Sequence, residues 1–151
     1  MSERTLVLVK PDGVQRGLIG EIVGRFERKG YRIAALKLMR MDEALAARHY
    51  GEHAGKPFYP GLVAFITSGP LVAMVVEGPG AVATVRAMMG ATNPASSAPG
   101  TIRGDLAVTI GMNVVHGSDS VERAATEVAL FFTPAEVLDY GRDVERWILE
   151  S

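Results

Sequence analysis

The chain has 151 residues, a length that suits one domain with a single core. Hydrophobic residues make up 48% of it and the net charge is −1, so nothing in the composition attracts it generally to nucleic acid or anionic membranes. The lack of cysteine excludes disulfides and thiolate metal sites. Because the first residues carry charges where a signal peptide needs an apolar core, and no apolar run is long enough to span a bilayer, we expect a cytoplasmic protein.

The first forty residues alternate between strand and helix patterns. Residues 5–9 (TLVLV) form a short apolar run that indicates a buried strand, and Lys10 and Pro11 end it. Residues 18–30 carry apolar side chains at helical spacing and finish with a glycine, which is typical of a helix C-terminus. Residues 31–41 alternate again and predict a second strand.

The middle of the chain repeats this order. Asp42 is placed to cap a helix, and a further short helix is expected after the prolines of KPFYPGL. Residues 71–78 predict another buried strand, and residues 79–90 predict a helix. The side chains that we expect to face inward from this second helix are Val82, Val85 and Met89. Residues 90–101 are rich in glycine, proline, serine and alanine, and they predict a long loop.

The last elements are a strand, a helix and a tail. Residues 106–117 contain a further strand, and residues 119–132 are patterned as a helix that Asp119 is expected to cap. The apolar or small residues expected on its core face are Val121, Ala124, Ala125, Val128, Ala129 and Phe132. The tail, residues 133–151, predicts one short helix with Trp147 as an anchor.

This order of elements predicts the fold class. A β-α-β unit, further helices and a second β-α-β unit fit two split units that share one sheet. We therefore expect an α+β protein with a ferredoxin-like, antiparallel four-stranded sheet covered by helices on one face. Residues 1–151 would form a single domain, with the C-terminal tail starting at about residue 133.

Three stretches partly match known motifs, but each lacks residues that its motif requires. HYGEH places His49 and His53 at the spacing of a zinc protease helix, but the required glutamate after the first histidine and a third ligand are missing. We therefore expect two solvated surface histidines. GEHAGKP is one residue short of a phosphate loop and has Pro57 where serine or threonine is needed, and EGPGAV lacks the third glycine of a dinucleotide fingerprint.

The stretch NVVHGSDS offers four interpretations of His116: a member of a hydrolase triad, a metal ligand, part of a capped turn, or a nucleophile itself. A triad with Ser118 is weakly supported, because triad residues usually lie far apart in sequence and the chain has no G-x-S-x-G motif. Glu127 lies at the edge of the apolar stripe of the next helix, where an unpaired carboxylate is costly. His116 is an available partner, and such a contact would fix the tautomer and leave the other ring nitrogen as a nucleophile. The alternative for Glu127 is a surface pair with an arginine of its own helix.

A set of polar residues is suited to meet a phosphate chain. Arginine favours phosphate because its planar fork donates paired, charge-assisted hydrogen bonds. Each candidate taken alone is explained more simply as a solvated surface group, but Arg103 lies in the glycine- and proline-shaped turn PGTIRGD. The candidates are Lys10, Arg86, Thr92, Arg103 and Asn113.

Together these stretches resemble the nucleoside diphosphate kinase family over nearly the full length of the chain. The resemblance rests on ERTLVLVKPDGVQRGLIGEI, HYGEHAGKPFY, FITSGP, PGTIRGD and NVVHGSDS, in this order and at this spacing. It implies transfer of the terminal phosphate of a nucleoside triphosphate, mainly ATP, to a nucleoside diphosphate by a ping-pong route, which balances the NTP and dNTP pools.

The resemblance also implies roles for single residues. His116 would be the nucleophile that is transiently phosphorylated, Glu127 would orient its ring, and Ser118 would support that carboxylate. Phe58 would stack on the base with Ile110 on the opposite side. The positions that match phosphate and ribose ligands are Lys10, Tyr50, Arg86, Thr92, Arg103 and Asn113. Mg²⁺ is expected on the phosphates of the nucleotide, without a dedicated protein cage.

The family further implies a homo-oligomer, which we expect to be a homohexamer with a homotetramer as the alternative. Two departures from the family pattern stand out: Phe131 occupies a position where many relatives have tryptophan, and the tail is longer than in the short bacterial members.

Two other function classes compete with this one. A catalytically silent relative would act as a binding module, but it would have lost the nucleophile or the phosphate ligands. A nucleic-acid-binding protein of ferredoxin-like fold would need a basic sheet face with exposed aromatics, which the strands here do not offer. We therefore expect neither a membrane partner nor specific nucleic-acid binding.

Overall fold

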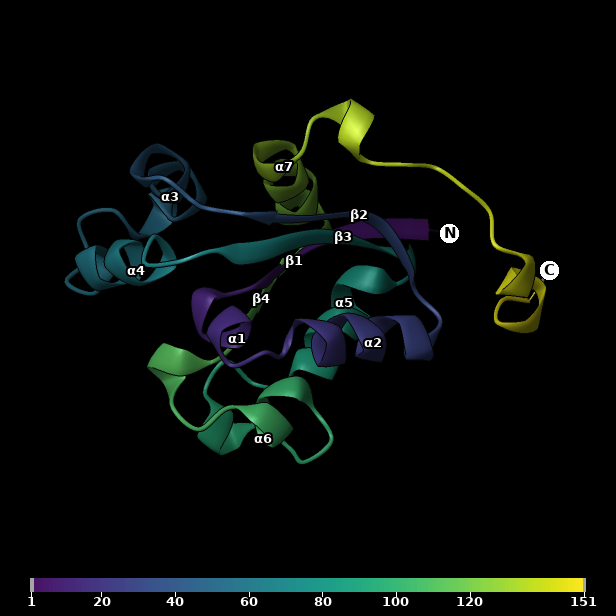
Figure 1. Cartoon of the computed structure of the whole chain (residues 1–151), viewed down its shortest axis with the longest axis horizontal. Coiled ribbons are helices and arrows are strands. Elements are labelled where there is room, and N and C mark those ends of the chain that lie inside the picture. The colour runs from purple at the N-terminus through teal and green to yellow at the C-terminus, as the bar shows by residue number, and fades with distance from the viewer. Residues whose placement is uncertain (1, 151) are drawn as a thin grey trace.

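The computed structural model of the chain describes residues 2–150. Its centre is a four-stranded antiparallel sheet with the strand order β2-β3-β1-β4 (Figure 1). The strands are β1 (Ser2–Val9), β2 (Arg32–Met39), β3 (Leu71–Pro79) and β4 (Val115–Gly117). The predicted α+β class with an antiparallel four-stranded sheet is confirmed.

The helices follow the sequence patterns closely, with two additions. Their bounds are α1 (Pro11–Gln15), α2 (Ile19–Lys29), α3 (Glu43–His49), α4 (Tyr59–Ile66), α5 (Ala81–Met89), α6 (Ile102–Leu106) and α7 (Val121–Phe131). Two of these helices were not predicted: α1 follows β1 directly, and α6 lies between the expected loop and the last strand. Helix α6 is capped by Thr101, whose hydroxyl accepts a hydrogen bond from the backbone N–H of Gly104 at 3.0 Å.

Local capping explains where several helices begin and end. Gly30 ends α2 with a φ of 113°, a left-handed conformation that glycine adopts without steric cost. Asp42 caps α3 as predicted, because its carboxylate accepts from the N–H of Leu45 at 2.7 Å. The cap predicted for α7 was wrong by one residue: Ser120 accepts from the N–H of Arg123, whereas Asp119 lies before the cap.

Side chains of β1 and β3 alternate between two hydrophobic cores, one on each face of the sheet. The first core packs the sheet against α2 and α5 and includes Val7, Val9, Ile22, Phe26, Met74, Val85 and Met89. The second packs it against α3, α4 and α7 and includes Leu6, Leu8, Ala46, Ile66, Val75 and Phe131. Helices therefore cover both faces, and the expectation of one covered face was wrong (Figure 1). The continuous burial of β1 over residues 5–9 follows from this arrangement.

Helix α7 buries a narrower stripe than its sequence predicted. Ala124, Glu127 and Phe131 are its buried residues, while Val121 is 55% exposed. These three positions follow each other at spacings of three and four, so they share one face of the helix. A glutamate in the middle of a buried face is costly unless polar groups meet it.

The tail is attached by polar contacts, and the expected anchoring by Trp147 was wrong because that side chain is 78% exposed. Arg142 donates hydrogen bonds to the carbonyls of Gly30 and Tyr31, and the hydroxyl of Tyr140 donates to the carbonyl of Ile33 at 2.6 Å. The tail contains two short 3₁₀ turns, Pro134–Glu136 and Asp143–Trp147. Within residues 2–150, no helix has both the length and the apolar character needed to cross a membrane.

Candidate active site

Pairing of β4 with β1 places His116 beside the end of the central strand. Leu8 is the partner of His116 in this pairing, and Val9 is the partner of Val115. One residue further on, the backbone N–H of Lys10 donates to the carbonyl of Val114 at 2.8 Å. Lys10 and His116 are therefore brought together by strand register although more than a hundred residues separate them in sequence.

The backbone is strained just before His116. Val114 has a φ of +74°, and it is the one non-glycine residue with positive φ among residues 2–150. The N–H of Val115 donates to the carbonyl of Asn113 at 2.8 Å, which closes a γ-turn around Val114. The carboxylate of Asp12 holds this turn by accepting from the N–H of Val114 at 3.0 Å. Such strain, of order 1–3 kcal/mol, persists only where the surroundings fix it, and it is concentrated at functional sites.

Glu127 is the hub of the contacts around the imidazole. Its Oε1 lies 3.1 Å from Nε2 of His116 and accepts a hydrogen bond from the hydroxyl of Ser118 at 2.6 Å. Its Oε2 accepts from Arg123, four residues earlier on α7, at 3.2 Å. Both partners considered from the sequence, His116 and a helical arginine, are therefore present. The burial of Glu127 is compensated by these donors.

The charge state of Glu127 fixes the tautomer of His116. Burial alone would favour the neutral acid, but the hydrogen bonds from His116 and Ser118 lower the pKa of Glu127 to about 2. The carboxylate is therefore ionised near neutral pH and acts only as an acceptor, so Nε2 of His116 carries the proton. When the ring is neutral, this tautomer has a free lone pair on Nδ1, for which residues 2–150 provide no hydrogen bond.

His49 lies inside the site, contrary to the expectation of a solvated histidine. Its side chain is 1% exposed and its ring meets that of His116 edge-on, with 4.7 Å between the centroids. The ring of Phe131 packs against it from α7 at 5.4 Å. Burial, followed by the charge of His116, lowers the pKa of His49 to about 3, so this imidazole is neutral near pH 7. His53, in the same sequence motif, is about one-third exposed and conforms better to the prediction.

Four of the predicted phosphate ligands form one hydrogen-bonded network. Lys10 Nζ donates to Asn113 Oδ1 at 2.9 Å, and Asn113 Nδ2 donates to the carbonyl of Thr92 at 2.9 Å. The guanidinium of Arg103 donates to the carbonyls of Asn113, Gly90 and Val115 at 3.2, 3.1 and 2.7 Å. Arg103 offers five N–H groups and uses three here, so two remain for a ligand.

The remaining cation, Arg86, reaches the site from α5. Its guanidinium donates to the carbonyl of Gly117, next to His116, at 3.2 Å, while the residue as a whole is exposed. Burial and the nearby charge of Arg103 lower the pKa of Lys10 to about 8. Burial and the charge of Arg86 lower the pKa of Arg103 to about 10. Mutual repulsion among cations is a sign of a site that is completed by an anion.

The aromatic candidates extend away from the nucleophile. The ring of Tyr50 lies 4.7 Å from that of His49, and burial together with Glu127 raises the pKa of Tyr50 to about 12. Beyond it, the ring of His53 lies 5.4 Å from that of Phe58. Phe58 is 50% exposed, and Ile110, on the 3₁₀ turn Ile110–Met112, is 59% exposed. Both apolar side chains are therefore available to a ligand.

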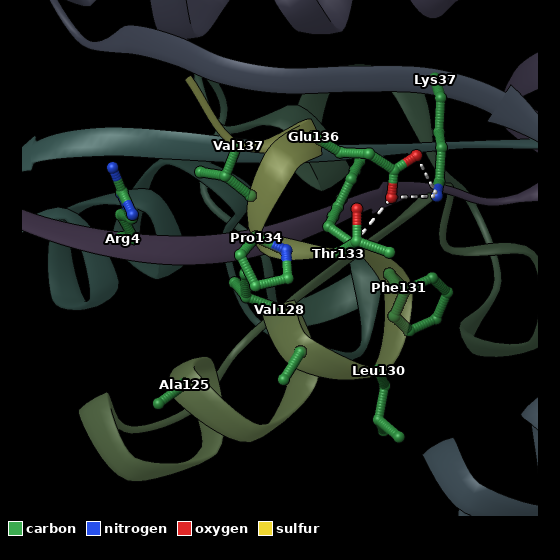
Figure 2. Close-up of a pocket in the computed structure, with 12 residues that line it drawn as sticks. Arg4, Lys37, Ala125, Val128, Leu130, Phe131, Thr133, Pro134, Glu136 and Val137 are labelled. Carbon is green, nitrogen blue, oxygen red and sulfur yellow. Dashed lines mark hydrogen bonds and ion pairs between the residues drawn. The ribbon is translucent and has the colours of Figure 1, made fainter. Parts of the chain in front are cut away.

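A cavity of about 160 Å³ lies over the imidazole. Its lining joins α3, β4 and α7, and its polar side chains include His49, Tyr50, Glu52, His53, Arg86, His116, Asp119, Arg123 and Glu127. A larger hollow of about 640 Å³ lies at the C-terminal end of α7 (Figure 2). That hollow is mainly apolar, Lys37 and Glu136 in its wall are paired with each other, and no histidine among residues 2–150 lines it. Chemistry rather than size therefore identifies the smaller cavity as the candidate active site.

Comparisons with known proteins agree on one family. The family model for nucleoside diphosphate kinase matches residues 3–137. The chain is 60% identical to a nucleoside diphosphate kinase of Desulforamulus reducens over 98% of this chain and 99% of that protein. It is 68% identical to one of Thermus thermophilus over 90% and 99%, respectively. A solved structure of a halophilic nucleoside diphosphate kinase from Halobacterium salinarum in complex with CDP superposes with a TM-score of 0.97 at 54% identity, covering 99% of this chain and 100% of that one.

The fold and the comparisons therefore define the class of protein as a nucleotide-binding phosphotransferase, an enzyme of the kinase type. More narrowly, the chain belongs to the nucleoside diphosphate kinase family.

Several residues of the site were not found from the sequence. His49 was assigned to the surface because the HYGEH motif lacks the other residues of a zinc protease helix, and its burial depends on packing against α7. The strain at Val114 and its support by Asp12 have no local sequence signal, because valine rarely adopts positive φ. Arg123 was recognisable only as the helical alternative partner of Glu127.

Proposed function

We propose that this chain transfers the terminal phosphate of a nucleoside triphosphate, mainly ATP, to a nucleoside diphosphate through a phosphohistidine at His116. The contact that carries this proposal is the 3.1 Å approach of Glu127 Oε1 to His116 Nε2 in the wall of the cavity. It keeps the proton on Nε2 and leaves Nδ1 as the nucleophilic atom. Ser118 supports the carboxylate through its 2.6 Å hydrogen bond.

The proposed chemistry has two half-reactions. In the first, the Nδ1 lone pair of His116 forms a bond to the terminal phosphorus while the bond from that phosphorus to the bridging oxygen breaks. The electron pair leaves with the diphosphate product, and the proton on Nε2 stays with the ring, where Glu127 stabilises the positive charge. In the second, a terminal oxygen of the incoming diphosphate forms a bond to the phosphorus while the Nδ1–phosphorus bond breaks, and the electron pair of that bond returns to Nδ1 and restores the neutral imidazole. Phosphoryl transfer depends mainly on position and charge, which this site supplies.

The cations and polar groups would hold the phosphates and ribose. Arg86 and the two unused N–H groups of Arg103 supply charge-assisted donors near β4. The ammonium group of Lys10 keeps two of its three protons free after bonding to Asn113. Since this network is fixed before a ligand arrives, little reorganisation is needed. The residues that we assign to phosphate and ribose binding are Lys10, Tyr50, Arg86, Thr92, Arg103 and Asn113.

The base would rest on apolar side chains outside the cavity. Phe58 offers an exposed ring for stacking, and we assign Ile110 to the opposite side of the base. The solved relative from Halobacterium salinarum carries CDP, a pyrimidine nucleotide, which agrees with stacking that does not depend on base identity.

Mg²⁺ would accompany the nucleotide phosphates. The cavity contains the carboxylates of Asp119 and Glu52, which are the residues that fit a Mg²⁺ ion, since one or two carboxylates plus phosphate oxygens are its usual ligands. When bound, the ion supplies positive charge to the phosphate oxygens.

Self-association as a homohexamer, with a homotetramer as the alternative, stays a prediction. It is supported by β2, which lies at the edge of the sheet and carries Leu36 and Leu38 with exposed fractions of 53% and 64%. Sedimentation of the dilute protein would decide between these states, and a monomer would contradict both. The cytoplasmic location and the role in balancing nucleotide pools also stay predictions.

The function is tested by separating the half-reactions. Incubation with γ-labelled ATP and Mg²⁺ but no acceptor should leave label on the protein, and addition of a nucleoside diphosphate should then discharge it into a triphosphate. A direct transfer that requires both nucleotides at once would contradict the ping-pong route. Absence of any transfer would favour a catalytically silent binding module.

A further inference from the structure

Two imidazoles and one carboxylate meet in the wall of the cavity, and the proposed reaction uses only two of these three groups. The ligand-capable atoms of His49, His116 and Glu127 all lie within 4.8 Å of one another. Among residues 2–150 this is the one such group of three that histidine and acidic side chains form. Mg²⁺ prefers oxygen ligands, so a cluster with two imidazoles does not suit it.

The ring of His49 has nitrogen atoms that are free to bind an ion at this cluster. Both of its ring nitrogens are buried without a hydrogen-bond partner in the described part of the chain, although the side chain is only 1% exposed. An unsatisfied buried polar group costs about 1–3 kcal/mol, so a partner that is not part of the chain is expected. His49 Nδ1 lies 4.0 Å from Glu127 Oε2, too far for a hydrogen bond but close enough to share an ion.

Two of the three groups, His49 and Glu127, are in the right chemical state for a metal at neutral pH. A low pKa keeps the imidazole of His49 neutral, and the carboxylate of Glu127 is ionised. Metal ions bind deprotonated carboxylates and neutral imidazoles, so no proton has to be removed from either group first. Two imidazoles and one glutamate with an open fourth position are the ligand set of many zinc sites.

The distances fit a tetrahedral ion after a small adjustment. Ligands about 2.1 Å from a zinc ion lie about 3.4 Å from each other in a tetrahedron. The separation of His116 Nε2 from Glu127 Oε1 is 3.1 Å, and that of His49 Nδ1 from Glu127 Oε2 is 4.0 Å. Rotation of the His49 ring would bring its Nδ1 within bonding distance of the ion, and the cavity provides the open fourth position.

We propose that His49, His116 and Glu127 form a Zn²⁺ site that competes with phosphorylation of His116, so that zinc switches the enzyme off. The consequence for catalysis rests on the proposed function. Zinc would take the Nε2 lone pair of His116, which moves the ring proton from Nε2 to Nδ1. A protonated Nδ1 has no lone pair for the terminal phosphorus, and Glu127 is bound to zinc instead of the imidazole. Water molecules of the hydrated ion leave as the three protein bonds form.

Neighbouring cations limit the affinity and provide a sensitive test. Arg123 donates to Glu127 Oε2 at 3.2 Å and must give up part of this contact when zinc binds, while Arg86 lies in the same cavity wall. Removing the charge of Arg123 should therefore tighten zinc binding. A structural role of His49 without metal binding does not predict this gain.

Binding of zinc alone tests the proposal without reference to catalysis. Untagged protein, freed of nucleotide, is titrated with ZnCl₂ and followed by calorimetry and equilibrium dialysis. We expect one Zn²⁺ per chain, Arg123→Gln to bind more tightly, and His49→Gln to bind at least about tenfold more weakly. His53→Gln, which removes a histidine of the same cavity outside the cluster, should bind as the parent does. Co²⁺ as a probe should give the visible absorption of a tetrahedral site in the unmutated protein, so the test does not depend on folding of the variants.

Labelling with γ-labelled ATP at matched free zinc then tests the switch. Zinc should stop labelling of the parent at free concentrations at which His49→Gln is still labelled, since any effect of zinc on the nucleotide itself would be common to both proteins. No zinc binding, or binding that His49→Gln leaves unchanged, would overturn the site even if phosphorylation proceeds as proposed. Binding without loss of labelling would overturn the switch.

Discussion

The two ends of the candidate site differ in how they are held. Around His116, polar groups are buried and bonded to one another: Glu127 has His116, Ser118 and Arg123 as partners, and Lys10 is bonded to Asn113. At the other end, Phe58 and Ile110 are half exposed on short segments without comparable contacts among the described side chains. On the proposed function, the phosphates, which all nucleotides share, would meet the fixed groups around His116 (the phosphate end), whereas the base would meet the apolar side chains of Phe58 and Ile110 (the base end). The phosphate end should be sensitive to single changes, and the base end should be tolerant.

Among the groups that hold the nucleophile in place, the largest loss of activity is expected from Glu127→Gln. The amide keeps the size of the side chain but removes the charge that holds the Nε2 proton of His116, so both tautomers become available. We expect the rate of labelling by γ-labelled ATP to fall by about 10²- to 10⁴-fold, the range found when orienting or acid–base groups are lost. Glu122→Gln, an exposed change on the same helix, is the control and should label normally. A Glu127→Gln protein that labels as fast as this control would remove Glu127 from the mechanism.

The second largest effect is expected from Arg103→Lys, which should lower the stability of the protein. A lysine cannot reproduce the fork that donates to three backbone carbonyls, so some of these buried acceptors lose their partner. We expect the free energy of unfolding in urea to drop by about 2–3 kcal/mol. Arg28→Lys, at a side chain that is 68% exposed, should stay within about 0.5 kcal/mol of the parent. Equal effects of the two changes would mean that the network does not hold the phosphate end in place.

Lowering the pH should reduce the free energy of unfolding, because His49 takes up a proton more readily in the unfolded chain. In the unfolded chain this imidazole takes up a proton below pH 6.5, whereas in the folded protein its pKa is lowered to about 3. Between these two pKa values the unfolded state therefore binds more protons than the folded state. The contribution of His49 to the free energy of unfolding is complete above pH 6.5 and decreases as the pH falls below it. Between pH 6.5 and about pH 5 we expect a loss of about 1–2 kcal/mol from this group.

Urea unfolding across that pH range checks this expectation. His49→Gln should flatten the dependence, and His53→Gln should keep the slope of the parent. An unchanged slope in His49→Gln would show that His49 takes up its proton without unfolding.

The smallest effect is expected at the base end. Because every base has an aromatic face and the ring of Phe58 is exposed, adenine, guanine, cytosine and uracil diphosphates should have values of kcat/KM within about tenfold of each other. Phe58→Ala should lower all four by a similar factor. A strong preference for a single base would instead indicate a side chain that recognises the edge of the base by hydrogen bonds.

Much of this architecture follows from local sequence patterns. The strands, the helix end at Gly30 and the cap at Asp42 depend on alternation, backbone freedom and one side-chain hydrogen bond. The contact of Glu127 with His116 was predictable too, because a carboxylate beside an apolar stripe needs a partner. Such features involve neighbouring residues or a single physical requirement.

The missed features depend on packing between distant segments. His49 is buried because α3 meets α7 and Phe131, and no neighbour of His49 along the chain reports this. Val114 keeps its positive φ because Asp12 and Lys10, a hundred residues away, bond to it. The cap of α7 is Ser120 and not the predicted Asp119. Both residue types are good caps, and the sequence alone does not choose between them.

The most direct test of the account is the location of the transferred phosphate. Protein labelled with γ-labelled ATP and Mg²⁺, then digested at alkaline pH, should give one labelled peptide containing His116, with label that survives base and is lost in acid. His116→Asn should abolish labelling and exchange while its circular dichroism and unfolding curve show an intact fold. Label on His49, an acid-stable phosphoserine at Ser118 that turns over, or normal labelling of His116→Asn would contradict the proposal that His116 is the nucleophile.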